Sequence, residues 1–194
     1  MKNEMKLLYP NPIYIATDIV SEDANRVAIE ECERLRKATT SQGVTWDCDV
    51  YCSMNDGNLF ENDVLRSLHE TIGAHVNLVA SQFVEEPVCE GTTAWFNMSG
   101  EGQYQESHIH QNSHFSAVYY IKTPEGSGPT VIGNPYQRHM LLPREKDNDL
   151  NAVSTYVPAV ERSLVVFQSF MPHYVPKGAN TDQRITHASN WSIV

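Results

Sequence analysis

Apolar residues recur at intervals of three and four between residues 62 and 83, the spacing that places side chains on one face of an α-helix. The set consists of Val64, Leu65, Leu68, Ile72, Val76, Val79 and Phe83. Asn62 or Asp63 stands before it as a helix cap. The pattern therefore predicts a long amphipathic helix over residues 62–83.

A shorter helical pattern covers residues 21–39. Ser21 is a suitable N-terminal cap, and Glu22 and Asp23 follow in the first turn, where negative charge is favourable. Val27 and Leu35 then mark an apolar face. This segment predicts a second amphipathic helix.

After Pro87 the helical spacing disappears, and short β-branched and aromatic runs alternate with Gly, Pro, Asn and Asp. The runs predict strands at residues 92–97, 114–122, 129–133, 154–157, 163–167 and 184–193. Short strands at such intervals favour a closed barrel or a jelly-roll sandwich. We expect one mainly β domain over residues 1–194, with a helical support region at about 1–86 packed on one sheet of a jelly-roll core at about 87–194.

Composition and charge argue against nucleic-acid-binding and membrane-associated functions. The chain has 194 residues, of which 41% are hydrophobic and 20% charged, so it can bury a core of its own. Its formal net charge of −10 and its lack of a basic run make nucleic acid an unfavourable partner. Charged residues and prolines interrupt the first fifteen residues, which predicts neither a signal peptide nor a membrane span. We expect a cytoplasmic protein that contacts no membrane.

Three histidines carry the strongest chemical signal. His108 and His110 are two residues apart, so on a strand they point to one side with Cα atoms about 6 to 7 Å apart. The alternative interpretation of this His-x-His motif is two surface or hydrogen-bonded histidines that bind no metal. His173, at the end of an apolar strand, adds a third imidazole from a distant part of the barrel. Together they predict a three-ligand metal site with open coordination positions.

A second signal lies near the C-terminus. Arg184 and Thr186 project to one side of a predicted strand, while Ile185 and His187 project to the other. A guanidinium binds a carboxylate through two parallel hydrogen bonds and keeps its charge when buried. Arg184 and Thr186 therefore predict a carboxylate-binding pair, although a surface salt bridge is the commoner role for an arginine.

These segments resemble a known family. Their order along the chain is the one seen in 2-oxoglutarate- and iron(II)-dependent oxygenases related to prolyl 4-hydroxylase-like enzymes. The segments are, in sequence, His108-Ile-His110, residues 116–120, Asn134-Pro135, residues 163–175, Arg184-Ile-Thr and Asn190. The resemblance extends over nearly the whole chain and implies a double-stranded β-helix. It also implies the cofactors Fe(II) and 2-oxoglutarate and a hydroxylase-type dioxygenase reaction.

By the same resemblance His108 and His173 are iron ligands, and Arg184, with Thr186 beside it, holds the distal carboxylate of 2-oxoglutarate. The chain departs from the pattern at His110, where most such enzymes have the aspartate of a His-x-Asp motif. Either His110 is the third ligand, or it is a neighbour of the metal shell. Asn97, Tyr104 and Tyr119 are further candidates for the 2-oxoglutarate pocket, and each of them is equally compatible with a packing role.

The all-histidine set keeps two alternatives open. One is a three-histidine cupin-type dioxygenase or metal-binding protein that does not use 2-oxoglutarate, and the other is a jelly roll without catalytic activity. The substrate, a small molecule or a peptide, is not specified by the sequence, nor is assembly into a homo-oligomer. We expect loops at residues 54–58 and 138–151 to set specificity. His69 and His75 are expected on the surface or in satisfied packing positions.

Overall fold

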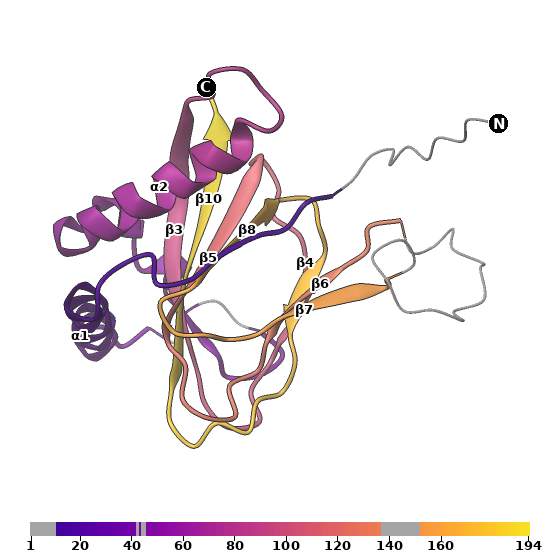
Figure 1. Cartoon of the computed structure of the whole chain (residues 1–194). Helices are drawn as coiled ribbons and strands as arrows, with labels where there is room; N and C mark the ends of the chain where they lie inside the picture. The colour runs from indigo at the N-terminus through magenta and orange to yellow at the C-terminus, as the bar shows by residue number, and fades with distance from the viewer. Residues whose placement is uncertain (1–10, 42, 44–45, 137–151) are drawn as a thin grey trace.

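The computed structural model describes residues 11–41, 43, 46–136 and 152–194. Two antiparallel sheets face each other, and two helices lie against the outer face of the larger sheet (Figure 1). The mainly β architecture with helices packed on one sheet, expected from the sequence, is confirmed. Within the described ranges, no helix is long and apolar enough to cross a membrane.

The larger sheet has six strands. Their order is β1 (Tyr14–Ala16), β8 (Leu164–Gln168), β5 (Phe115–Lys122), β10 (Arg184–Ile193), β3 (Cys89–Ser99) and β2 (Tyr51–Cys52). The long strands β3, β5 and β10 lie together at its centre, where β10 pairs with both of the others. This central position holds the inward-facing side chains of β10 in fixed places.

The smaller sheet has four strands, in the order β4 (Gln105–His108), β9 (His173–Val175), β6 (Thr130–Gly133) and β7 (Ser154–Val157). All six strands predicted from the sequence are present in the two sheets, within a few residues of their expected bounds. Strands β1, β2, β4 and β9 were not predicted. Two of these, β4 and β9, pair with each other and carry candidate metal ligands.

Both predicted helices are present. Helix α1 (Glu22–Ala38) begins after Ser21, whose hydroxyl accepts a hydrogen bond from the Ala24 amide. The second helical segment begins as the 3₁₀ turn η3 (Asp63–Leu65) and continues as α2 (Arg66–Ala80), so it is shorter than expected at its C-terminal end. The side chain of Asn62 caps it, as predicted. Two further 3₁₀ turns, η1 (Ser53–Asn55) and η2 (Leu59–Glu61), precede it.

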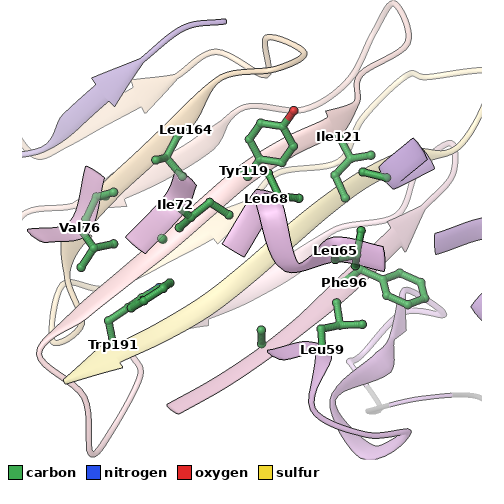
Figure 2. Packing of buried hydrophobic residues seen from close by; sticks show 14 of the residues in the cluster. Leu59, Leu65, Leu68, Ile72, Val76, Phe96, Tyr119, Ile121, Leu164 and Trp191 are labelled. Carbon is green, nitrogen blue, oxygen red and sulfur yellow. The ribbon is translucent and has the colours of Figure 1, made fainter. Parts of the chain in front are cut away.

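The main hydrophobic core lies between the helices and the larger sheet, as Figure 2 shows. Leu68, Ile72 and Val76 of α2 pack there against sheet residues that include Phe96 and Ile121. Full burial of each such side chain stabilises the fold by about 1.5–3 kcal/mol. The core fixes the outer face of the larger sheet and leaves its inner face free to form a site.

A second apolar cluster fills part of the space between the two sheets. It consists of Tyr120, Ile132, Val157, Val165, Phe167 and Met171. Side chains alternate along β10, so Ile185 joins the core under the helices while Arg184 and Thr186 face the other sheet. The rest of the space between the sheets is a cavity, and the candidate site lies in it.

Candidate functional site

The three predicted histidines come together between the sheets. His108 ends β4 and stands opposite His173, the first residue of β9, while His110 follows β4 by two residues. Their ligand atoms all lie within 4.8 Å of one another. Among the described residues, no other group of three histidines, cysteines or carboxylates is placed to hold a metal.

Hydrogen bonds orient all three imidazoles in the same way. The Nδ1 atoms of His108 and His173 lie 2.7 and 3.0 Å from the backbone carbonyls of Glu106 and Met171. The Nδ1 of His110 lies 2.5 Å from the Asn190 side-chain oxygen. Each Nδ1–H therefore donates to an oxygen, which leaves Nε2 with its lone pair as the ligand atom.

Burial keeps these imidazoles neutral. Together with the nearby His108 and His110, it lowers the pKa of His173 to about 3. Burial likewise lowers the pKa of His110 to about 4 and lowers that of His108. At neutral pH the three nitrogens need lose no proton before they bind a cation.

The histidines line a cavity of about 290 Å³ that also contains Arg184. Arg184 is 2% exposed, and its Nε and Nη2 atoms have no hydrogen-bond partner. Its guanidinium carbon lies 5.5 Å from the centre of the Tyr120 ring, and burial lowers its pKa. Because a buried cation without a partner is strongly unfavourable, the arrangement fits an anionic ligand that enters the cavity.

Two of the other predicted pocket residues lie beside Arg184. Thr186 stands opposite Asn97 in the β10–β3 pairing, and both line the cavity. The side-chain oxygen of Asn97 is buried and has no partner. These two residues bring a hydroxyl and an amide to the same end of the cavity as the guanidinium.

The predictions for Tyr119 and Tyr104 are wrong. Tyr119 points to the helix side of the larger sheet, where its hydroxyl donates to Asn25 of α1 at 2.7 Å (Figure 2). Tyr104 precedes β4 and does not line the cavity, and the Lys177 ammonium lies 5.5 Å from its ring centre. The neighbouring Tyr120 faces inward instead, because successive residues of a strand point to opposite faces.

Several residues of the site were not found by sequence reasoning. Trp46 and Trp95 flank the histidines, with ring centres 4.9 Å from His108 and 5.4 Å from His110. Met54, in the first of the two predicted specificity loops, also lines the cavity. The second loop, residues 138–151, lies outside the described residues. A lone tryptophan gives no signal in the sequence that separates a cavity wall from a core position.

Asn190 positions His110, which gives a first testable prediction. Replacement of Asn190 by leucine removes the nearer of the two oxygens at His110 Nδ1, since the Ser116 hydroxyl lies 2.9 Å from the same nitrogen. The change is expected to weaken metal affinity about tenfold. Asn190→Asp keeps an acceptor there and should retain most of the affinity. The measurement is anaerobic titration with iron(II) or cobalt(II).

Thr93→Val provides the matched control, because it removes the acceptor of the Asn190 side-chain amide nitrogen without touching His110. Equal metal affinity in Asn190→Leu and the wild type would show that Asn190 does not orient the imidazole.

His187 points away from the cavity, as predicted, and lies in the core beside His69 of α2, with ring centres 5.1 Å apart. The expectation for His69 is wrong: it is 7% exposed, and its Nε2 has no partner. Both ring nitrogens of His187 are also unpaired. Burial lowers the pKa of His69 to about 4 and that of His187 to about 3.

This pair predicts a loss of stability in acid. Below pH 6.5 these two histidines bind protons in the unfolded chain, whereas in the folded protein they stay neutral down to about pH 4. The free energy of unfolding therefore decreases as the pH is lowered. The decrease is about 1.4 kcal/mol per pH unit for each residue. His187→Leu should lower by about one the number of protons taken up on unfolding, and so reduce the pH dependence of the free energy of unfolding. The measurement is denaturant unfolding of the metal-free protein from pH 7 to 4. His114→Gln, at an exposed position, should keep the wild-type slope.

Comparison with solved structures identifies the fold. A prolyl-4-hydroxylase from Pseudomonas putida matches with a TM-score of 0.62 at 17% identity, covering 94% of this chain and 92% of that chain. The epimerase SnoN in complex with Fe3+, alpha ketoglutarate and nogalamycin RO matches with a TM-score of 0.66 at 12% identity, covering 94% and 79%. HygX from Streptomyces hygroscopicus, with nickel and 2-oxoglutarate bound, matches with 0.61 at 11%, covering 94% and 83%. The double-stranded β-helix is thereby confirmed.

A search of curated proteins found no significant match. A model of the family described as "Putative 2OG-Fe(II) oxygenase" matches residues 93–190, about half of the chain, from within β3 to within β10. The matched segment contains all three histidines of the cavity and Arg184. On this match the chain belongs to the family of 2OG-Fe(II) oxygenases.

Proposed function

We propose that this oxygenase binds iron(II) through His108, His110 and His173 and binds 2-oxoglutarate through Arg184 and Thr186. The observation that carries the proposal is the buried, unpaired Arg184 guanidinium in the same cavity as three converging imidazoles. Iron(II) and 2-oxoglutarate, when bound, would supply together with dioxygen the oxidative decarboxylation that is coupled to oxidation of a substrate.

The donor set fits these groups. Imidazole nitrogen is a suitable ligand for iron(II), and three ligands on one side leave positions open for small molecules. Because all three ligands are neutral, the full double charge of the metal remains to attract the 2-oxoglutarate dianion. Arg184 and Thr186 then offer a charged and a neutral donor to the distal carboxylate.

The walls of the cavity serve to exclude water. Trp46, Trp95 and Val118 line it around the histidines, and Ile109 and Met54 stand nearer the outside, where they are 47% and 44% exposed. Exclusion of water strengthens the electrostatic contacts of Arg184 and the metal with a bound anion. The protein thus orients both reactants and lowers the local polarity.

The three-histidine dioxygenase without 2-oxoglutarate has only His110 in its favour. It does not by itself supply an anion for the buried Arg184, whereas 2-oxoglutarate brings a distal carboxylate. Family membership and Arg184 both support the 2-oxoglutarate reaction. We therefore assign His110 to the metal as a third neutral ligand.

We further propose that the chain works as one domain in the cytoplasm on a small molecule or a peptide. Cys32, Cys48 and Cys89 form no disulfide in the structure, which suits a reducing compartment. Structures of the same fold range from a prolyl-4-hydroxylase to an epimerase of nogalamycin biosynthesis, so the fold itself does not select a substrate.

An anaerobic titration tests the proposed cofactors. Protein loaded with iron(II) should develop a weak visible charge-transfer band as 2-oxoglutarate is added, because a keto acid that chelates iron absorbs there. Protein without iron should show no band. Absence of the band, with iron demonstrably bound, would contradict the proposal.

A further inference from the structure

One buried polar atom of the cavity has no role in the proposed binding of iron or 2-oxoglutarate. The indole Nε1 of Trp46 is buried and has no hydrogen-bond partner, and the ring lies 4.9 Å from that of His108. An unpaired buried N–H is unfavourable unless a bound molecule supplies an acceptor. Trp46 therefore points to a second ligand beside the metal site.

Trp46 lines the cavity beside His108, one of the proposed metal ligands. The segment that it begins runs beside β4, held by contacts of Asp49 with Gln103, Cys48 with Tyr104 and Asp47 with Glu106. Ser99 pairs with Arg184, and the chain after Ser99 passes through Gln103, Tyr104 and Glu106 before it reaches His108. The Trp46 donor thus lies at the metal end of the cavity.

The surroundings of this donor are aromatic and apolar. Trp95 is 4% exposed and lies 5.4 Å from the His110 ring, so the metal ligands stand between two indoles. Met54 and Ile109 extend the apolar lining. A substrate group that reaches the metal therefore contacts hydrocarbon and aromatic surfaces and one N–H donor.

Charge selects further among substrates. Among the described residues that line this cavity, Arg184 is the only charged one, and none is a carboxylate. The three histidines are already assigned to the metal. An ammonium or guanidinium group would meet the metal without a counter-charge, and the one protein cation is already assigned to 2-oxoglutarate. The site therefore suits an uncharged group.

Size limits how much of the substrate enters. The cavity of about 290 Å³ lies at the lower end of the roughly 300–1,000 Å³ typical for whole small ligands, and it must also hold 2-oxoglutarate. At Ile109, His110 and Gln111 it adjoins a second hollow of about 590 Å³, lined partly by Phe83 and Phe170. The remainder of a larger substrate has room there.

We propose that the substrate inserts an uncharged, amide-linked group between Trp46 and Trp95, and that the Trp46 indole donates a hydrogen bond to its carbonyl oxygen. This inference rests on the proposed function, since it places the group beside the metal. It excludes free amino acids and amines, whose ammonium group has no partner in the cavity, and selects acylated residues of a larger molecule.

The test uses protein loaded with zinc(II) and 2-oxoglutarate, in which binding is measured without turnover. Calorimetry compares apolar amino acids with their N-acetyl amides in matched pairs. At least one N-acetyl amide should bind at least tenfold more tightly than its free amino acid. Trp46→Phe should weaken binding of that amide about tenfold, the effect of one lost hydrogen bond, and leave 2-oxoglutarate affinity unchanged.

Tyr156→Phe is the control, because it removes an exposed hydroxyl of β7 outside the cavity and should bind like the wild type. The inference is overturned if free amino acids or amines bind as tightly as the amides, if Trp46→Phe binds amides normally, or if no amide binds. Failure of zinc-loaded wild type to bind 2-oxoglutarate would instead overturn the proposed function.

Discussion

Replacement of Arg184 by leucine is expected to weaken 2-oxoglutarate binding at least a hundredfold while metal affinity stays the same. The guanidinium is the only charged group on the part of the cavity wall that the structure describes, and two of its nitrogens have no hydrogen-bond partner. Two charge-assisted hydrogen bonds contribute about 1.5–3 kcal/mol each, which accounts for a loss of this size. Calorimetry with the metal-loaded protein measures both affinities.

The same variant should be at least as stable to heat as the wild type when 2-oxoglutarate is absent. Without 2-oxoglutarate, leucine removes a buried guanidinium whose Nε and Nη2 have no hydrogen-bond partner, so the variant should melt at or above the wild-type temperature. Addition of 2-oxoglutarate should raise the melting temperature of the wild type and leave that of the variant unchanged. Arg66→Leu, at an exposed position, is the control and should respond like the wild type. An equal 2-oxoglutarate shift in Arg184→Leu would show that the clamp is assigned wrongly.

Loss of His173 is expected to have the second large effect, on the metal. His173 is 4% exposed, begins β9 and has its Nδ1 held by the Met171 carbonyl, so its Nε2 is fixed toward the other two imidazoles. Loss of a hydrogen-bonding neighbour of a metal ligand weakens affinity 10- to 100-fold, and loss of the ligand itself should exceed that range. His173→Ala should therefore bind iron(II) or cobalt(II) more than a hundredfold more weakly.

Two variants make this prediction specific. His114→Ala removes a nearby exposed imidazole, whose Nδ1 accepts from the Ile193 amide, and should bind metal like the wild type. His110→Asp should retain metal, because it substitutes a carboxylate ligand for an imidazole. Normal metal affinity in His173→Ala would remove His173 from the proposed site.

The pattern of the sequence predicted both helices and six strands, including the four-residue β6 and β7, and missed four short strands. Helices α1 and α2 and six strands have apolar spacing long enough to be seen without tertiary information. Strands β1, β2, β4 and β9 have only two to four residues, and β4 consists of Gln105, Glu106, Ser107 and His108. Such strands exist because a neighbouring strand pairs with them, and their own residues give no alternating pattern.

The error at Tyr119 has a related cause. Both faces of β5 are covered, one by the helices and one by the smaller sheet, so its residues are almost all apolar and show no alternation. A shift of one residue then exchanges every side chain between the core and the cavity. The choice between Tyr119 and Tyr120 depends on the pairing of β5 with its neighbours, which includes a register shift between Ile185 and Thr186 of β10.

The sequence by itself determined the chemistry of this protein: three imidazoles, a guanidinium beside a hydroxyl, and a mainly β chain with two amphipathic helices. Those conclusions depend on residue type and local spacing, which are properties of the chain alone. Only the tertiary structure decided which polar atoms remain unpaired after burial, among them those of Arg184 and Trp46. Hydrogen-bond satisfaction depends on groups brought together from distant parts of the chain, so no local pattern carries that information.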